Sequence, residues 1–518
     1  MEGSMLRSFA GGLLALIGYV AWRSYSSSRR KLPPGPRPDP IIGNLRQFPR
    51  HSQEKGFKAW GDQYGDVVYV QVLGQGMLVL NSMRAARDLL EKRSAHYSDR
   101  PRLVALGELM GWELVLTQMP YGDRFKRHRR LFQDHFSRSM VQSFRPIQTQ
   151  EVHNLLNGLI TRPEWFQTHV RRFAAGTIMQ IAYGHVVHSV EDPYVKLSDD
   201  ALAATINYGA PGCALVDMVP ALKHWPLWMP GAGFKRRTQE IRQLVRAMVE
   251  TPFEMVKRKM KTGTCPPCFT SSLLENYQKT FGNVDAADAE EDIKGAAGVL
   301  YGAGSDTIAS SLNTFILAMV MHPDVYAKAQ EELDRVVGPS RLPDLEDRPD
   351  LPYLNSVLKE VHRWNPPIPL GMPHKLMAKD DDYRGYFIPK DTMVFSNIWA
   401  MMNDSEIYPE PHRFRPERYL EMTDEEAERH DPREAVFGFG RRLCPGKLFA
   451  DTGFFLAASR ITATLDLLAV LDENGRLPCA RFTGDIVRYP SPFKCIIKPR
   501  SESCRQLILE EDHQAANI

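Results

Sequence analysis

Ten residues, 437–446, constrain this chain more than any other segment, and they read Phe-Gly-Phe-Gly-Arg-Arg-Leu-Cys-Pro-Gly. Three glycines surround Cys444, and glycine lets backbone N–H groups come close to a sulfur or a flat ligand. A thiolate stays ionised beside positive charge and hydrogen-bond donors, and arginines also bind carboxylates through forked donors. We therefore expect Cys444 to ligate a metal in a carboxylate-bearing cofactor. The competing interpretation, a small buried cysteine in a glycine-rich turn, does not account for the arginines.

The loop resembles the haem-binding signature of the cytochrome P450 family, Phe-x-x-Gly-x-Arg-x-Cys-x-Gly. Every fixed position matches: Phe437, Gly440, Arg442, Cys444 and Gly446. In that family the cofactor is haem b, and the cysteine is the axial iron ligand whose electron donation favours O–O cleavage. The resemblance implies the same role for Cys444 and cofactor binding by Phe437 and Arg442. The motifs are also similar to those of fungal enzymes related to O-methylsterigmatocystin oxidoreductase.

Length, charge and cysteine content narrow the possible classes of protein. At 518 residues the chain exceeds the usual size of one domain, so length alone predicts two or three. A net charge of +3 is too small to indicate nucleic-acid binding. Seven scattered cysteines do not indicate a disulfide framework, and the pair in Cys265-Pro-Pro-Cys268 is expected to be reduced and solvent-facing. These features are typical of a reducing compartment.

The first 31 residues differ in composition from the rest. Residues 8–22 carry no charge and are mostly apolar, and basic residues follow them. A helix of this length covers about 22 Å, and flanking arginines that extend outward allow it to span a ~30 Å bilayer core. Positive charge after the segment keeps the following chain in the cytosol. We predict a single-pass signal anchor at residues 1–31 in the endoplasmic reticulum membrane, rather than a cleaved signal peptide.

The rest of the chain is predicted to be mainly α with a minor β region. Prolines at 32–38 predict a stiff hinge, similar to the one after the anchor of microsomal family members, and 39–518 is assigned to one catalytic domain. Residues 67–73 and 77–80 predict a β-hairpin. Helical spacing marks the ranges 82–94, 148–159, 171–183, 234–261, 293–321, 354–364 and 448–468. The resemblance implies the cytochrome P450 fold.

The predicted helix 293–321 contains Gly-Ala-Gly-Ser-Asp-Thr, which ends in Asp306 and Thr307. Two glycines inside a helix cost roughly 1 kcal/mol each relative to alanine and can bend it, so we expect the helix to open and leave room for a small ligand. A carboxylate and a hydroxyl beside that space can relay protons. The segment resembles the family's oxygen-activation motif, which implies catalytic roles for Asp306 and Thr307. Ile308 stands where relatives usually carry a second hydroxyl. Alone, the segment would indicate a surface aspartate beside a core threonine.

Glu360 and Arg363 lie three residues apart near the end of a predicted helix, so they share one face. Alone, they would form a solvated ion pair that contributes little to stability. Arg418 follows in Pro-Glu-Arg-Tyr, ahead of the cysteine loop. The three together resemble the family's Glu-Arg-Arg triad. This resemblance implies a buried structural network that fixes the loop around the cofactor.

Several basic residues are candidates for binding the haem propionates. Residues 121–130 resemble the family helix whose Trp-x-x-x-Arg contacts a propionate. Arg129 fills the arginine position, whereas Phe125 replaces the tryptophan and removes an indole N–H donor. The resemblance implies that Arg442 and His374 supply further donors. Without the resemblance, His374 would be interpreted as a loop histidine facing water.

Candidate substrate-pocket segments are mostly apolar, which fits terpenoids, polyketides, aromatics and fatty acids equally: 103–119, 204–213, 296–300, 368–371 and 485–488. Arg488 is interpreted as a surface residue, with anchoring of a substrate carboxylate as the alternative. The loop Trp-Pro-Leu-Trp-Met-Pro at 225–230 fits core packing and a second membrane contact equally well.

Together, the motifs imply a haem-thiolate monooxygenase that hydroxylates or epoxidises a lipophilic molecule with dioxygen, in fungal secondary metabolism or xenobiotic oxidation. Electrons would come from NADPH through the flavins of NADPH–cytochrome P450 reductase, with cytochrome b5 as a further partner. Candidate docking residues for this acidic partner are Arg124, Lys126, Arg127 and Arg130. One alternative is a reductase-independent haem-thiolate isomerase or dehydratase. Such members often lack the acid–alcohol pair that Asp306 and Thr307 provide. The other alternative is a non-catalytic haem sensor.

Overall fold

The computed structural model describes residues 31–209, 214–282, 284–471, 473, 475–484 and 486–515. The predicted anchor segment, residues 8–22, lies outside these ranges. Within them, no helix combines the length and apolar character needed to cross a bilayer. The chain separates into two compact units: unit 1 contains the described residues up to Pro101 together with Pro373–Asn397, and unit 2 contains the others. The predicted domain boundaries stay predictions.

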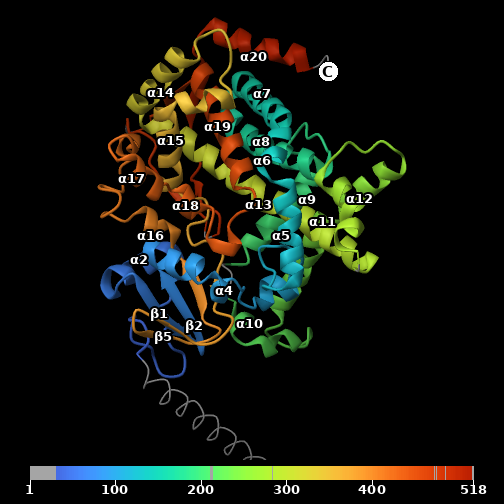
Figure 1. Ribbon diagram of the computed structural model, residues 1–518, viewed down its shortest axis with the longest axis vertical. Coiled ribbons are helices and arrows are strands. Elements are labelled where there is room, and N and C mark those ends of the chain that lie inside the picture. Colours follow the sequence, from blue (N-terminus) through green and yellow to red (C-terminus); the bar gives the residue numbers. More distant parts are fainter. Residues whose placement is uncertain are drawn as a thin grey trace, which may run out of the picture. The chain divides into compact units, whose positions relative to one another are not determined.

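Unit 1 is built on a four-stranded sheet, seen in blue and orange in Figure 1. The strand order is β1–β2–β6–β3, with β2 and β6 parallel and the other neighbours antiparallel. The strands are β1 (Val67–Val72), β2 (Gln75–Leu80), β3 (His374–Lys375) and β6 (Met393–Ser396). Leu73 and Gly74 join β1 to β2 with φ of 47° and 88°, and two successive positive φ values are typical of a tight hairpin turn. The predicted hairpin is confirmed.

The helices of unit 1 are short. α2 (Gln53–Tyr64) packs against β1. The helix predicted over 82–94 is present but divided into α3 (Met83–Ala86), the π-helical segment η1 (Arg87–Lys92) and α4 (Ser94–Tyr97). A second, two-stranded sheet pairs β4 (Asp381–Tyr383) with β5 (Tyr386–Ile388). Helical periodicity alone does not distinguish an α-turn from a π-turn, so the division was not predicted.

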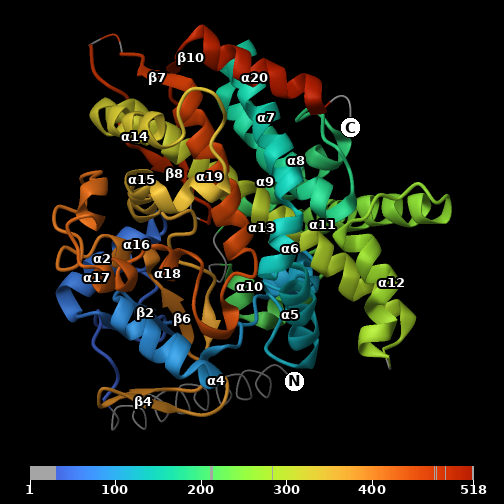
Figure 2. The ribbon, with the colours of Figure 1, turned by 45° about the horizontal axis from the view of Figure 1, so that its top comes forward.

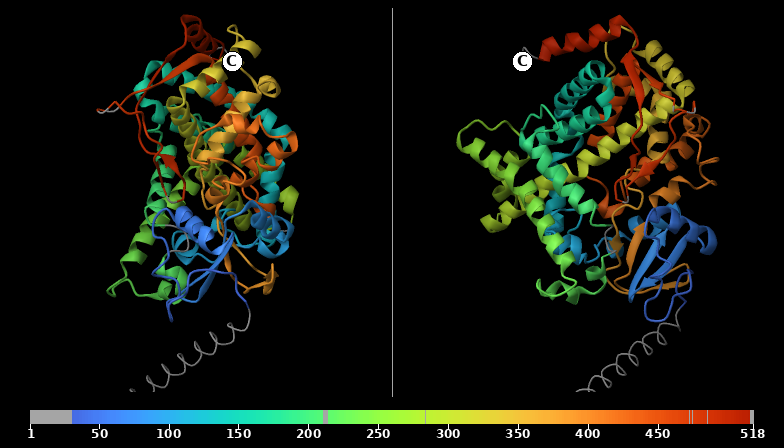
Figure 3. Two further views of the ribbon diagram at one scale, coloured as in Figure 1. Left: turned by 90° about the vertical axis from the view of Figure 1, so that its left-hand side faces the viewer. Right: turned by 180° about the vertical axis from the view of Figure 1, so that it is seen from behind.

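Unit 2 is mainly helical, as Figures 1 and 3 show. Its longer helices are α5 (Asp123–His135), α7 (Arg145–Thr161), α8 (Phe166–Tyr183), α9 (Pro193–Ile206), α11 (Gly233–Lys261), α12 (Phe269–Phe281), α13 (Ala286–Met321), α14 (Pro323–Val336), α15 (Pro352–Trp364), α19 (Lys447–Thr464) and α20 (Glu502–Ala515). Shorter helices are α6 (Arg138–Ser143), α10 (Leu215–Met218), α16 (Ile398–Met402), α17 (Asp424–Arg429) and α18 (Arg433–Val436). The mainly α class with a minor β region is confirmed, and each predicted helix of this unit begins earlier than its pattern indicated.

The 36-residue helix α13 is the central helix of unit 2 and packs against α8, α11, α15 and α19 (Figure 2). The Asp285 carboxylate caps its first turn by accepting a hydrogen bond from Ala287 N. At the other end, Pro323 begins α14 directly after His322. The residues of α13 are apolar on most sides, so tertiary packing on all of them stabilises its length.

The predicted opening of this helix at its glycine pair is absent, because α13 stays helical from Ala286 to Met321. Gly304 instead allows close packing on α8, where a Cβ would lie 2.8 Å from Ile178 Cδ1. Ala303 is exposed between these packed faces, so the helix borders an open space there without unwinding.

The helix predicted over 448–468 ends four residues early. α19 stops at Thr464, and the next residues form β7 (Leu465–Ala469), which pairs antiparallel with β10 (Cys495–Pro499). Leucines fit a helix face and a strand equally well, so a partner strand thirty residues away decided this boundary. A further two-stranded ladder joins β8 (Phe482–Thr483) to β9 (Tyr489–Pro490).

Candidate functional site

Cys444 lies in a tight loop between the 3-10 helix η8 (Gly440–Arg442) and α19. The backbone N–H of Cys444 donates to Phe437 O at 2.8 Å, which closes the loop across the motif. Gly438 and Gly440 have φ of 81° and 55°, values that residues with a Cβ rarely adopt. The glycines are therefore required by the turn that presents the cysteine.

The surroundings of the Cys444 sulfur act on its charge in opposite directions. Desolvation raises the pKa of the Cys444 thiol, whereas the Gly446 N–H and the positive charges of Arg129 and Lys447 lower it. A bound metal cation adds the positive charge that deprotonates a coordinating thiol outright. The sulfur thus has a hydrogen-bond donor and positive charges that favour a thiolate, and a bound cation would lower the thiol pKa further.

Arg442 is held above the ring of Phe125, with its guanidinium carbon 3.7 Å from the ring centroid. It also donates to the carbonyl oxygens of Leu116 and Met119, at 3.3 and 2.8 Å. Phe125 is 3% exposed and packs against Tyr121. The phenylalanine in the tryptophan position therefore supports an arginine by stacking, although it donates no hydrogen bond.

Arg129, on α5, donates from Nη1 to Leu443 O at 2.5 Å, directly beside the cysteine. Among the described residues it forms no ion pair with a carboxylate, and desolvation lowers the pKa of its guanidinium. A desolvated cation without a counter-charge fits an anionic group that comes from outside the chain. Together with the glycine-lined sulfur and Arg442, this arrangement fits haem, whose two propionates would supply the missing negative charge.

The structure brings Glu360, Arg363 and Arg418 together, and all three are buried. Arg363 binds the Glu360 carboxylate through two hydrogen bonds of 2.8 Å, and Arg418 Nε donates to it at 3.2 Å. The arginines also donate to backbone carbonyls of the segment that leads to the cysteine loop: Met402, Pro409, Pro411 and Arg413. Every forked donor thus meets an acceptor, as a buried charge requires.

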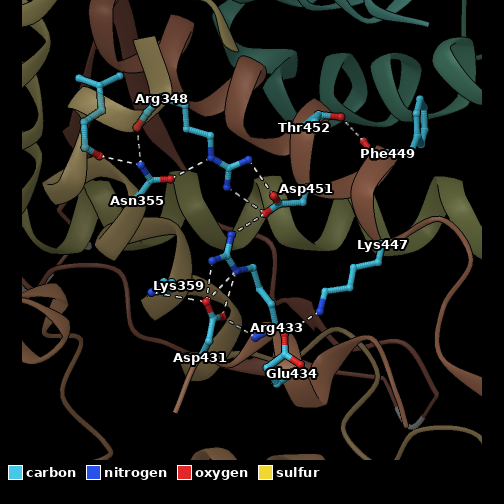
Figure 4. Close-up of polar contacts among 11 residues, drawn as sticks. Arg348, Asn355, Lys359, Asp431, Arg433, Glu434, Lys447, Phe449, Asp451 and Thr452 are labelled. Carbon is cyan, nitrogen blue, oxygen red and sulfur yellow. Dashed lines mark hydrogen bonds and ion pairs between the residues drawn. The ribbon is translucent and has the colours of Figure 1, made fainter. Parts of the chain in front are cut away.

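A second ion network, which the sequence did not predict, supports the first turns of α19 (Figure 4). The Asp451 carboxylate binds Arg348 at 2.7 Å and Arg433 at 3.1 Å. Arg433 also binds Asp431, which Lys359 approaches to 3.4 Å. These residues come from four separate segments, so the cysteine loop is clamped to its surroundings on the side of the helix that follows it. The sequence signal that could have indicated this network is Asp451, the single acidic residue in the largely apolar α19.

His362 lies inside the Glu-x-x-Arg segment and packs against the cysteine loop. Its ring centroid is 6.0 Å from that of Phe437 and 5.2 Å from that of Phe454. Burial lowers the pKa of His362 to about 4, so the imidazole is neutral at physiological pH and serves as a flat packing surface. The Phe437 ring is thereby held on one side by an aromatic cluster.

The acid–alcohol pair lies on α13, which packs against the α19 helix that begins after Cys444. Thr307 Oγ1 donates to Ala303 O at 2.8 Å, within its own helix. Asp306 accepts a hydrogen bond from Tyr489 Oη at 2.6 Å. The two side chains are neighbours in sequence, but each has a different partner.

His374 belongs to unit 1, where it lies on β3 and is 5% exposed. Its Nδ1 is 2.8 Å from Tyr97 O. The interpretation as a water-facing loop histidine is wrong, because the strand buries the ring. Its contact with a propionate stays a prediction.

A cavity of about 500 Å³ lies between the predicted pocket segments 103–119 and 204–213. Its lining is mostly apolar and includes Met110, Tyr208, Leu222 and Phe234, with Thr205 and Asp217 as polar members. Neither Cys444 nor Thr307 lines it. The predicted surface position of Arg488 is wrong: it is 6% exposed, and its guanidinium lies over Phe482 and Trp399.

Three of the four predicted docking residues form ion pairs within the chain. Arg124 and Arg127 bind the buried Asp292 carboxylate at 2.6 and 3.3 Å, which ties α5 to α13. Lys126 and Arg130 on the same helix are exposed, and Lys126 pairs with the exposed Asp123 at 3.0 Å. The exposed positive charge beside Arg129 therefore comes from these two residues.

Comparison with known proteins agrees with this geometry. A family model described as Cytochrome P450 matches residues 33–496. The chain therefore belongs to the cytochrome P450 family, a family of oxidoreductases that incorporate oxygen.

Similar curated proteins come from fungi. The chain is 43% identical to Cytochrome P450 monooxygenase 136 of Postia placenta over 98% of this chain and 95% of that protein. It is 40% identical to Cytochrome P450 monooxygenase ple1 of Rhodocybe pseudopiperita, over 95% of this chain and 94% of the relative. It is 39% identical to Cytochrome P450 monooxygenase claR of Ampulloclitocybe clavipes, over 96% of this chain and 93% of the relative.

Proposed function

We propose that this protein is a haem-thiolate monooxygenase that oxidises a lipophilic small molecule with electrons supplied by a reductase. The observation that carries the proposal is the Cys444 loop, which combines a sulfur among backbone donors with the desolvated cation Arg129 and the stacked Arg442. Fungal secondary metabolism is the proposed setting, because curated relatives from several fungi carry the name monooxygenase.

In this proposal the chain holds and orients the cofactor. Bound haem would supply the activation of dioxygen and insertion of one oxygen atom. Cys444 would hold the iron, and Arg129, Arg442 and His374 would bind the propionates. The triad of Glu360, Arg363 and Arg418, together with the Asp451 network, would keep the loop rigid, so that the sulfur does not shift when charge at the iron changes.

On the other face, Asp306 and Thr307 would manage protons and water. The Thr307 hydroxyl borders the exposed Ala303 and can turn from its helical carbonyl to a ligand in that space. Asp306 would take up and release the protons that reduction of oxygen to water requires. An isomerase or dehydratase needs no such protons, so this pair favours the monooxygenase over that alternative.

The substrate is proposed to be mainly apolar with few polar groups. The cavity beside α10 and α11 offers apolar walls with a hydroxyl from Thr205 and a phenol from Tyr208. Pockets of this kind bind ligands by burial and use a few polar groups to orient them. Terpenoids, polyketides, aromatics and fatty acids all fit that description.

The endoplasmic reticulum membrane is the proposed location. Large apolar side chains are exposed over residues 215–228, and Trp228 and Leu215 are 80% and 59% exposed. Lys223 and Lys235 lie beside them, a combination that suits a lipid headgroup surface. In vesicles of brominated lipid, quenching of tryptophan emission should fall in Trp228→Phe. Trp165→Phe, which removes another exposed indole, should leave the quenching unchanged.

NADPH–cytochrome P450 reductase is the proposed electron donor, with cytochrome b5 as a second donor. Lys126, Arg130 and the exposed Arg441 of the cysteine loop provide positive charge for an acidic partner. Electrons would then enter on the cysteine side of the cofactor.

The proposal is tested by reconstituting the full chain with haem, reductase and NADPH and screening apolar substrates under ¹⁸O₂. We expect NADPH consumption and a product that carries one ¹⁸O atom. Product without NADPH consumption would support the isomerase or dehydratase. Haem binding with neither product nor NADPH consumption would support the sensor.

A further inference from the structure

Asp306 has a partner that is distant in sequence. Tyr489, on β9, donates from Oη to Asp306 Oδ1 at 2.6 Å, across a separation of 183 residues. Among the described residues, the Asp306 carboxylate forms no other hydrogen bond. One of its oxygens is therefore occupied and the other remains open.

The position of Tyr489 is fixed by its own strand. The preceding carbonyl, Arg488 O, accepts hydrogen bonds from Ser310 Oγ on α13 and from Asn365 Nδ2. Ser310 lies four residues after Asp306, so both lie on one face of the helix. The chain at Arg488 and Tyr489 is thus docked along one turn of α13, which keeps the phenol within reach of Asp306.

The charged residues near Asp306 and Tyr489 are partly exposed to solvent. Arg171, on α8, binds Asp199 of α9 at 3.0 Å, and their side chains are 50% and 20% exposed. Tyr301 Oη also donates to Asp199, at 3.4 Å. Desolvation lowers the pKa of Arg171, but Asp199 and then Asp306 raise it, and the net shift is upward. Asp306 therefore lies in the field of a partly exposed cation.

The Tyr489 hydroxyl acts as a donor under all physiological conditions. Desolvation and the negative charge of Asp306 raise the pKa of Tyr489 far above its usual range. The phenol therefore does not release its own proton to Asp306. It fixes the orientation of the carboxylate instead.

We propose that Tyr489 is the positioning residue of Asp306, an inference that rests on the monooxygenase function proposed above. Its phenol holds Oδ1 and directs the carboxylate toward the Arg171–Asp199 pair, which leaves Oδ2 as the oxygen that exchanges protons. Oδ2 takes up a proton from bulk solvent on the side of the partly exposed Arg171 and releases it toward the space beside Ala303, and Asp306 returns to its charged form. Without the phenol, the Asp306 carboxylate can rotate, and a smaller fraction of protons is delivered in the productive orientation.

The test is Tyr489→Phe in the reconstituted full chain. The share of NADPH electrons that appears as hydrogen peroxide should rise roughly tenfold, the effect of losing one hydrogen bond to a charged group. The kinetic solvent isotope effect should change as well. A readout independent of turnover is the C–O stretching band of the carbon monoxide adduct, which should shift because the Asp306 dipole moves.

The matched control is Tyr326→Phe. Tyr326 is a buried tyrosine, whereas Tyr489 is partly buried, and the Tyr326 hydroxyl donates to the backbone carbonyls of Ile461 and Leu465, away from Asp306. This variant should lose comparable stability and leave the peroxide share and the C–O band unchanged. Arg171→Met, on the partly exposed side of the network, should raise the peroxide share in the same direction by roughly threefold, the effect of losing a partly exposed charge.

The inference is overturned if Tyr489→Phe and Tyr326→Phe give the same peroxide share, isotope effect and C–O band. An unshifted band in Tyr489→Phe alone also overturns it, even if no substrate is found. Failure of the monooxygenase proposal is a separate result, in which the wild-type protein consumes no NADPH.

Discussion

The two faces that the proposed cofactor would contact are stabilised in different ways. Around Cys444, a short motif sets the backbone, and one buried and one partly buried ion network hold it from several sides. Around Asp306, the surrounding contacts are a single hydrogen bond from Tyr489 and the partly exposed Arg171–Asp199 ion pair. An electron-donating ligand must stay fixed, whereas a proton-delivering carboxylate must exchange with solvent. The difference in rigidity therefore matches the difference in chemistry.

Removing Glu360 should produce the largest effect, because it leaves the buried Arg363 and Arg418 without a counter-charge. Glu360→Ala should lower the free energy of unfolding by about 3–5 kcal/mol, measured by urea denaturation. Glu425→Ala, which breaks the exposed ion pair with Arg429, should cost less than about 1 kcal/mol. Equal losses in the two variants would show that the cysteine side is no more rigid than the surface.

Removing the charge of Asp306 should affect chemistry and leave the fold intact. In Asp306→Asn the amide oxygen can still accept from Tyr489, so stability should change little, but the proton carrier is lost. We expect coupled product formation to fall roughly a hundredfold, within the range for general acid catalysis. Asp334→Asn, at a surface ion pair with Arg500, is the matched control. If Asp306→Asn forms product with the same coupling to NADPH consumption as the wild type, Asp306 does not carry the protons.

The stacking of Phe125 under Arg442 should matter for retention of haem. Phe125→Leu removes a cation–π contact worth about 1 kcal/mol and frees the arginine to move. Transfer of haem to an apo-globin acceptor should become several-fold faster. Phe281→Leu, which removes the weaker contact with Arg130, should not change the rate. Unchanged haem transfer in Phe125→Leu would mean that position 125 does not support the propionate site.

Reversing exposed charge on α5 should have the smallest effect. The double variant Lys126→Glu, Arg130→Glu should raise the KM for reductase several-fold and flatten its dependence on ionic strength. Arg258→Glu, at an exposed position on α11, is the control. If both variants behave alike, electrons do not enter on the cysteine side.

The same contrast explains what the sequence could predict. The β1–β2 hairpin, the helix positions and the Cys444 loop depend on neighbouring residues, and the Glu360–Arg363 pair lies within one helical turn. Local patterns therefore indicated the hairpin, the tight loop and the approximate helix ranges, whereas the Glu360–Arg363 pair alone indicated a solvated contact and is in fact buried. The end of α19 at Thr464 depends on β10, and the burial of Arg488 depends on Trp399 and Phe482, so both predictions were wrong.

Several contacts near the site had no local signal at all. Tyr489 meets Asp306 only because β9 docks on α13, and Asp292 binds Arg124 and Arg127 only because α5 packs beside that helix. Likewise, the glycine pair in α13 was predicted to open the helix, and this prediction was wrong. Gly304 instead makes room for Ile178, which comes from α8 and has no signal in the local sequence. Contacts between distant segments are set by tertiary packing, which periodicity does not record.

The central claim is that Cys444 ligates haem iron as a thiolate. The most direct measurement is the carbon monoxide difference spectrum of the reduced, haem-bound full chain, compared between the wild type and Cys444→Ser. We predict the thiolate-type spectrum for the wild type and its loss in Cys444→Ser. A thiolate-type spectrum that survives in Cys444→Ser would contradict the account, because another residue would then have to bind the iron.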